Sequence, residues 1–179
     1  MPFVEETEDN LIVSVPEDRY FRFEQCDTHA KVSANGVSEC DFAWTTDCGD
    51  LWLMELKDYG PDSRGELADA VESLRTKLPK NITHAYLLVS AVWAKTPFGQ
   101  ALRADIEATF PDFPDGSFPT CAALVIHLEN PQDKPLLLGL QDAIQGALSV
   151  LGLKAVLVLP ALDDALEDKI GIRIRPHSQ

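Results

Sequence analysis

Four short stretches within the first sixty positions alternate between hydrophobic and polar residues, the first of them weakly, which is the period of β-strands. An Asn-Gly pair at Asn35 and Gly36 is typical of a tight turn and predicts a hairpin just before the third of these strands. The pattern therefore predicts strands over Leu11–Val15, Tyr20–Gln25, Val37–Thr45 and Leu51–Lys57.

The middle of the chain changes to the spacing of helices. Ser63 and Glu66 form a capping box, and the apolar positions from Leu67 to Leu78 recur on one helical face. The segment 83–94 is apolar enough for a buried helix or a strand, and a helix is favoured. Thr96 as N-cap and Pro97 in the first turn predict a further helix from that point.

The proline-rich segment 111–119 predicts a loop, and a strand–helix–strand pattern follows it. The order of elements indicates an α/β fold, with a central mixed β-sheet flanked by helices in one domain spanning residues 1–179. After the loop we expect a strand at 121–129, a helix at 135–151, a strand at 154–160, a short helix or turn at 161–169 and an edge strand at 172–175.

The formal net charge of −14 changes the range of possible partners. Such a field repels nucleic acid at long range and argues against tight, non-specific DNA binding. Residues 51–110 nevertheless hold 8 acids and 7 bases, so a local metal-bridged phosphate contact is compatible with the composition.

Localisation is inferred from what the chain lacks in sequence. No apolar run approaches the ~20 residues of a membrane span, and the acidic N-terminus does not resemble a signal peptide. Four cysteines in 179 residues are too few for a disulfide scaffold. We therefore expect a reduced, cytoplasmic protein with no membrane partner.

Ionisable residues within two otherwise apolar strands are the strongest chemical signal. Alternation places Glu55 and Lys57 on one face of their strand, with Leu51 and Leu53, and places Trp52, Met54 and Leu56 on the other. In the preceding strand it places Glu39, Asp41 and Ala43 together, opposite Cys40, Phe42 and Trp44. Pairing of the two strands would bring Glu39, Asp41, Glu55 and Lys57 to one end of the sheet.

Three carboxylates in one place repel one another unless a cation lies between them. Oxygen ligands favour Mg²⁺ or Mn²⁺, which acidify bound water and stabilise charge on a phosphoryl oxygen. The residues therefore predict a divalent metal site, with Lys57 beside it.

Asp41, a gap of 13 residues and then Glu-x-Lys on an apolar strand resemble the PD-(D/E)XK nuclease superfamily, which has the restriction-endonuclease-like fold. The resemblance implies a metal-dependent nuclease in which Asp41 and Glu55 bind the metal and Lys57 is the catalytic lysine. Cys40 stands where that family has proline. The family's further glutamate has no clear counterpart here, because Glu6, Glu8 and Glu24 are not on a predicted helix, and Glu39 is a possible substitute.

Basic residues on or beside the following helix, namely Arg64, Arg75 and Lys77, could guide a phosphate backbone, or could be its ordinary polar face. The sequence has no separate recognition domain, so we expect a protein partner or a homodimer to select the target.

Other interpretations stay open. Glu55 and Lys57 could be a simple exposed ion pair where the sheet meets water. A second Glu-x-Lys, at Glu167 and Lys169, lies in a segment that looks helical and is interpreted as a solvated face. The same fold could also be a catalytically silent acidic module that binds a protein as an inhibitor or immunity-type subunit. A zinc site built from Cys26, His29, Cys40 and Cys48 has no recognised spacing, and His84 and His127 are expected to be hydrogen-bonded core residues.

Overall fold

The computed structural model describes residues 2–60, 67–110, 120–128 and 130–177. The predicted capping box at Ser63 and Glu66, the basic residue Arg64, the loop 111–119 and Glu129 lie outside these residues.

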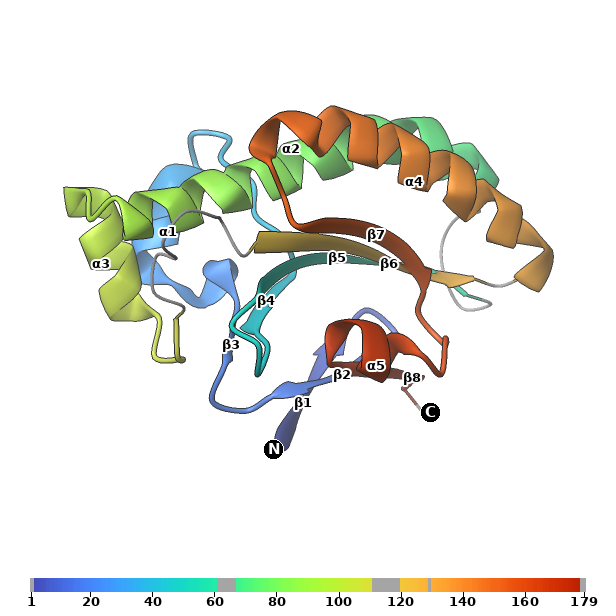
Figure 1. Cartoon of the computed structure of the whole chain (residues 1–179), viewed down its shortest axis with the longest axis horizontal. Coiled ribbons are helices and arrows are strands. Elements are labelled where there is room, and N and C mark those ends of the chain that lie inside the picture. The colour runs from blue at the N-terminus through green and yellow to red at the C-terminus, as the bar shows by residue number, and fades with distance from the viewer. Residues whose placement is uncertain (1, 61–66, 111–119, 129, 178–179) are drawn as a thin grey trace.

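A five-stranded mixed sheet forms the centre of the molecule (Figure 1). Its order is β3-β4-β5-β6-β7, in which β4 is antiparallel to both of its neighbours and β6 is parallel to both of its neighbours. The mixed α/β class predicted from the sequence is therefore confirmed. The strands are β3 Tyr20–Phe21, β4 Phe42–Thr45, β5 Leu51–Tyr59, β6 Thr120–Leu128 and β7 Ala155–Pro160.

Helices cover one face of this sheet (Figure 1). Their apolar stripes pack on Leu51, Leu53 and neighbouring side chains in one hydrophobic cluster. The helices are α1 Asp27–Ser33, α2 Leu67–Trp93, α3 Pro97–Asp105 and α4 Lys134–Leu148, and short 3-10 turns lie at Phe23–Gln25, Pro131–Asp133 and Ser149–Leu151.

Helix α2 unites two segments that the sequence pattern separates. The predicted helix from Leu67 continues through Pro79 into the segment 83–94, for which a helix was correctly favoured. A proline normally disfavours a helix interior, but Leu78, Ile82 and Ala85 are buried on either side of it and hold the helix on the sheet. Helix α3 begins as predicted, with Thr96 Oγ1 accepting a hydrogen bond from the Gly99 amide at 2.9 Å.

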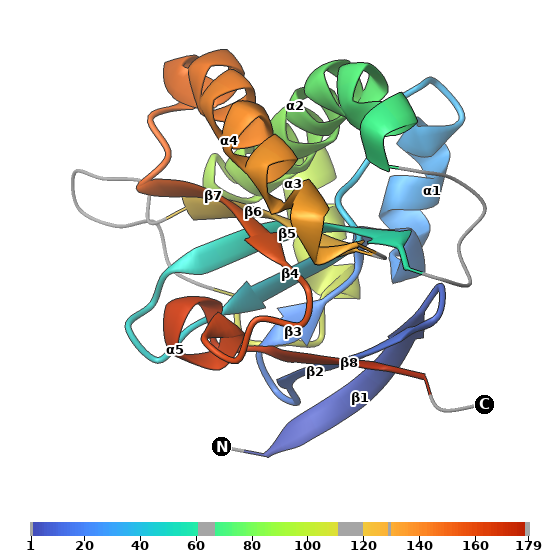
Figure 2. The same cartoon turned by 90° about the vertical axis from the view of Figure 1, so that its right-hand side faces the viewer.

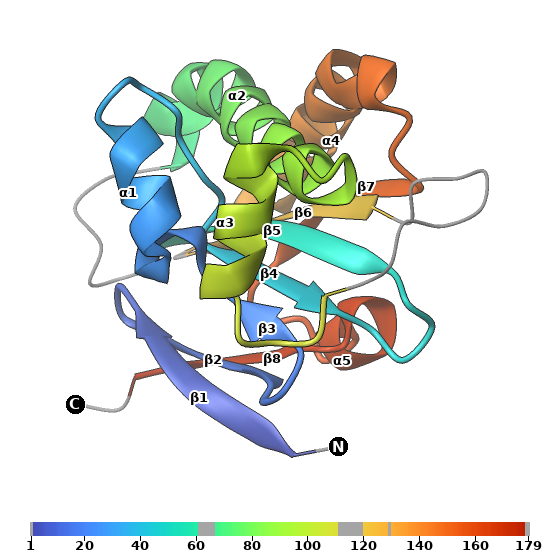
Figure 3. The same cartoon turned by 90° about the vertical axis from the view of Figure 1, so that its left-hand side faces the viewer.

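A second, smaller sheet covers the opposite face of the large one (Figure 2). It joins the two ends of the described chain, because β2 pairs with both β1 and β8 (Figure 3). Its apolar side chains, together with those of a short helix, pack on Trp44 and Trp52, whose rings stack 6.2 Å apart. The strands are β1 Phe3–Glu8, β2 Leu11–Pro16 and β8 Arg173–Pro176, and the helix is α5 Leu166–Ile170.

Three local predictions are wrong. Strand β1 was not predicted, because five acidic or polar residues in Glu5–Asp9 mask its alternation. The Asn-Gly pair forms no hairpin: Gly36, at a φ of 81°, follows α1, and a left-handed glycine is equally typical of a helix end. The strands predicted at Tyr20–Gln25 and Val37–Thr45 are shorter, and only Tyr20–Phe21 and Phe42–Thr45 form strand pairs.

The helices among the described residues include none that is long and apolar enough to cross a membrane.

Candidate active site

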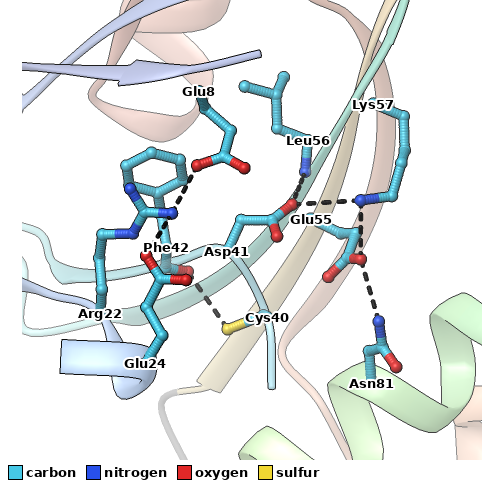
Figure 4. Close-up of polar contacts among 10 residues, drawn as sticks. All are labelled: Glu8, Arg22, Glu24, Cys40, Asp41, Phe42, Glu55, Leu56, Lys57 and Asn81. Atoms are coloured by element: carbon cyan, nitrogen blue, oxygen red, sulfur yellow. Dashed lines mark hydrogen bonds and ion pairs between the residues drawn. The ribbon is translucent and has the colours of Figure 1, made fainter. Parts of the chain in front are cut away.

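Strand pairing brings the predicted acidic residues together. Phe42 lies opposite Met54 in the last antiparallel pair of β4 and β5, and Asp41, the residue before β4, lies beside Glu55 (Figure 4). Glu55 and Lys57 share the helix-covered face with Leu53, as alternation predicted, while Leu56 faces the small sheet. Cys40 differs from its prediction: it lies in the helix-side core, because alternation stops where strand pairing stops, at Phe42.

Lys57 joins the two carboxylates (Figure 4). Its Nζ is 3.0 Å from Glu55 Oε1 and 3.4 Å from Asp41 Oδ2. Asp41 Oδ2 also accepts a hydrogen bond from the Leu56 amide at 2.7 Å, which fixes that carboxylate against β5. Of the four residues predicted to converge, Asp41, Glu55 and Lys57 do so.

Glu55 is an unusual carboxylate because it is only 3% exposed. Asn81 Nδ2 of α2 donates to Oε1 at 3.0 Å, whereas Oε2 is buried without a hydrogen-bond partner in the described part of the chain. Burial, and then the charge of Asp41, raise the Glu55 pKa to about 7, against the opposing effects of Lys57 and Asn81. This carboxyl group can therefore gain or lose a proton near neutrality.

Lys57 shows the complementary effect. Burial alone would lower its pKa, but the charges of Glu55 and Asp41 outweigh burial and raise it. Its side chain is 33% exposed, so the charged ammonium lies where solvent meets the carboxylate pair.

Asn81 was missed by the sequence analysis. The signal available was its position in α2, between the buried residues Leu78 and Ile82 on the sheet side of the helix. Lys77, one turn earlier on the same stripe, is exposed, and His84, one turn later, accepts a hydrogen bond from the Ser38 amide at 3.0 Å.

Arg75 does not lie on this stripe. Arg75 forms a 3.4 Å ion pair with Glu72, and one of its terminal nitrogens lies 3.8 Å from the Cβ position at Gly139 of α4. Arg75 is thus directed towards α4, whereas Lys77 lies on the helix side that carries Asn81.

Glu39 does not reach the cluster. Its Oε2 lies 3.1 Å from Nε2 of the buried His29 in α1, and its described ion pairs do not include Lys57. The loss of strand pairing before Phe42 explains this, because alternation no longer directs Glu39 to the side of Glu55.

A second charged cluster lies beside Asp41 (Figure 4). Arg22 is 7% exposed, stacks over the Phe42 ring at 4.6 Å and forms ion pairs with Glu8 and Glu24. Burial, together with the charge of Asp41, raises the Glu8 pKa in spite of Arg22. Two of the upstream acids that sequence inspection considered are therefore near Asp41, but both are already paired with Arg22.

The zinc alternative gains no geometric support. Within the described residues, no three side chains of His, Cys, Asp or Glu are grouped so that they could hold a metal ion. Cys26 and Cys40 are buried, and Cys48 is exposed. A metal at Asp41 and Glu55 would accordingly take only two protein carboxylates from this part of the chain.

No family model, curated protein or solved structure matches this chain.

Proposed function

We propose that this protein is a Mg²⁺- or Mn²⁺-dependent nuclease of restriction-endonuclease-like fold, with Asp41 and Glu55 as metal ligands and Lys57 as the catalytic lysine. The observation that carries the proposal is Glu55 Oε2, a buried carboxylate oxygen without a hydrogen-bond partner among the described residues, next to a second carboxylate. A buried acceptor of this kind is costly unless something occupies it in the working state.

The donor set fits a hard cation. Mg²⁺ characteristically binds through one or two carboxylates, keeps several waters and takes further ligands from substrate phosphates. Asp41 and Glu55 offer oxygens only, which matches this preference better than that of zinc. When bound, the ion would lower the pKa of its water and stabilise charge on a phosphoryl oxygen.

Lys57 supports the same chemistry from the protein side. An ammonium group has three donor hydrogens, and the two carboxylates occupy two of the three directions. The third has no partner among the described residues and could donate to a phosphoryl oxygen or hold a water in place. Lys77, on the same helix stripe as Asn81, would contact the phosphate backbone outside the reacting group.

The first experiment is a calorimetric titration with Mn²⁺ at pH 8, where Glu55 is mainly ionised. Wild type should bind saturably, and both Asp41→Ala and Glu55→Gln should lose at least about tenfold in affinity, equivalent to ~1.4 kcal/mol. Glu167→Gln is the matched control, because it removes an exposed carboxylate from the other Glu-x-Lys and should leave binding unchanged.

A nuclease assay follows on single-stranded DNA, duplex DNA and RNA. We expect metal-dependent cleavage of at least one substrate, and loss of at least ~100-fold in rate for Lys57→Ala with metal binding retained, since removing one positioned charge-stabilising donor typically costs that much. A folded wild-type protein that binds no Mn²⁺ at millimolar concentration would overturn the proposal.

A second candidate is a catalytically silent module that binds a protein partner. The favouring observation is that Lys57 already neutralises the space between Asp41 and Glu55, as a structural ion pair would. In that case Asp41→Ala would lower stability, would change no metal binding, and would leave an acidic surface suited to a basic protein.

A further inference from the structure

A second polar arrangement lies on the other face of β5, one residue beyond Lys57. Asp58 Oδ1 is 2.7 Å from His127 Nδ1 and accepts the Gly60 amide at 2.8 Å, and Asp58 Oδ2 accepts Asn10 Nδ2 at 2.9 Å. The site was missed at the sequence level, where His127 was expected only to be a hydrogen-bonded core residue. That expectation is correct, but it describes only one of the two ring nitrogens.

The hydrogen bonds to Asp58 determine which ring nitrogen of His127 carries the hydrogen when the ring is neutral. Burial alone would raise the Asp58 pKa, but the hydrogen bonds from Gly60, Asn10 and His127 outweigh it and lower the pKa. An ionised Asp58 can only accept, so His127 Nδ1 carries a hydrogen and the neutral ring has its lone pair on Nε2. Nε2 has no hydrogen-bond partner among the described residues.

The position of the ring is strictly fixed. A Cβ atom at Gly60 would lie 2.3 Å from His127 Cε1, so only glycine leaves room for the imidazole at this place. The Asp58 side chain is 4% exposed and that of His127 is 12% exposed. The arrangement therefore presents one oriented nitrogen, Nε2, rather than a mobile surface histidine.

His127 lines a hollow of about 420 Å³ together with residues at the carboxyl ends of the parallel strands β6 and β7 and with Lys134 of α4. Figure 1 shows these strand ends and the start of α4 on the same side of the molecule. This edge of a parallel sheet is where open α/β folds bind ligands, and the volume suits a small molecule. Leu128, Pro160 and Leu162 give apolar walls, and Leu162 is 49% exposed.

The hollow is lined by one cation that forms no ion pair in the described part of the chain, and by two acids. Lys134 lines it and has no ion-pair partner among the described residues. Asp163 also lines it, but its carboxylate is occupied by Lys169 at 2.9 Å and by the Ala165 amide at 3.0 Å. Asp164 and Lys134 are both exposed, so solvent screens both charges, and the charge of Lys134 also helps to lower the pKa of Asp163.

We propose that this hollow binds a small phosphate monoester, with the phosphate between His127 Nε2 and the Lys134 ammonium and the organic part against Leu128 and Leu162. One proton is shared by the phosphate and His127. Either an imidazolium donates to a dianion, or a monoanion donates its P–OH hydrogen to the imidazole, and the proton count is the same. Lys134 donates to a second phosphate oxygen in both cases.

The test is an NMR titration of the full chain with phenyl phosphate, inorganic phosphate and phenyl sulfate. Phenyl phosphate should saturate at millimolar concentration, bind about tenfold more tightly than inorganic phosphate because of its apolar ring, and shift amides at 126–128 and 161–164. Phenyl sulfate, which has no oxygen basic enough to share the proton, should bind more weakly than phenyl phosphate.

Variants assign the contacts. Lys134→Gln, a change at an exposed residue, should weaken phenyl phosphate at least fivefold, and Lys80→Gln, an exposed lysine on α2, should not. The chemical shifts of the His127 ring nitrogens should change on binding. They should either move towards the imidazolium pattern or keep the Nδ1-protonated pattern with the change expected for a new hydrogen bond at Nε2. Asp41→Ala should leave the titration unchanged, which separates this site from the proposed nuclease centre.

Three results would each overturn the proposal. These are no saturable shift with phenyl phosphate at about 10 mM, equal affinity in wild type and Lys134→Gln, or a His127 ring that does not respond at saturation. Any of them would leave the Asn10–Asp58–His127 arrangement as a structural tie between the two sheets.

Discussion

The chain contains the pattern Glu-x-Lys on strand β5, at Glu55 and Lys57, and again on helix α5, at Glu167 and Lys169. In a strand, residues two apart point to the same side, and Lys57 contacts Glu55 at 3.0 Å. In a helix, residues two apart point to nearly opposite sides. Glu167 accordingly pairs with Arg173, and Lys169 pairs with Asp163.

The two glutamates also differ in their electrostatic state. Burial raises the Glu55 pKa to about 7, whereas hydrogen bonds from Arg173 lower the Glu167 pKa at the surface. The sequence-based interpretation of Glu167 and Lys169 as a solvated face is confirmed. One tripeptide pattern thus yields an ordinary surface acid on a helix and a poorly satisfied, titratable acid on a buried strand.

The largest expected difference between the two copies comes from their lysines. Lys57→Met leaves Asp41 and Glu55 without their shared counter-charge, a change that costs about 3–5 kcal/mol for a fully buried pair. Because the Lys57 side chain is 33% exposed, we expect a loss of about 3 kcal/mol in unfolding free energy at pH 8. Urea unfolding followed by circular dichroism measures it.

Lys169→Met is the matched control, since its pair with Asp163 is 43% and 27% exposed. We expect a loss below about 0.5 kcal/mol, as for most surface ion pairs. Similar losses for both variants would mean that burial of Glu55 does not distinguish the two copies.

The next largest effect is the pH dependence of stability. Folding raises the Glu55 pKa from its ordinary 4.5 to about 7, so the folded state holds this proton more tightly than the unfolded state. The resulting stabilisation is complete below pH 4.5 and is lost as pH rises through about 7. Relative to Glu55→Gln, wild type should lose on the order of 2 kcal/mol between these limits.

The comparison of wild type with Glu167→Gln should show the opposite pH dependence of stability. Its pKa is lowered in the folded state, so its stabilisation is present above the ordinary value of 4.5 and is lost as pH falls. Urea midpoints measured from pH 4 to pH 8 for the three proteins provide the comparison. A wild-type profile parallel to that of Glu55→Gln would show that the Glu55 pKa is ordinary.

The fold could be predicted where period and capping agree. Strand β5 and helix α3 carry complete local signals, an apolar alternation in one case and Thr96 with Pro97 in the other. Elements stabilised mainly by tertiary contacts were missed or misjudged. Strand β1 depends on pairing with β2, and α2 passes through Pro79 because the sheet holds both halves of the helix.

In the candidate site, too, local patterns predicted some residues, and others are placed by contacts that are distant in the sequence. Alternation within β5 placed Glu55 and Lys57 correctly, and pairing with β4 added Asp41. Glu39 lies two residues farther from the paired strand, where alternation no longer applies, and its partner is His29. Asn81 comes from a helix 26 residues along the chain from Glu55, and no local pattern of residues reports a contact of that range.

The smallest expected effect is that of removing Asn81, the hydrogen-bond partner of Glu55 on α2. Asn81→Leu removes the 3.0 Å hydrogen bond to Oε1, for which we expect a loss of about 1 kcal/mol at pH 8. The Glu55 pKa should rise further, because Asn81 stabilises the ionised form.

Mn²⁺ affinity should therefore fall more at pH 6 than at pH 8 in Asn81→Leu, since the metal competes with a more tightly held proton. Thr76→Leu, at an exposed position of the same helix, is the control and should leave the pH dependence unchanged. Equal losses of affinity at both pH values would show that Asn81 holds α2 against β5 without setting the Glu55 pKa.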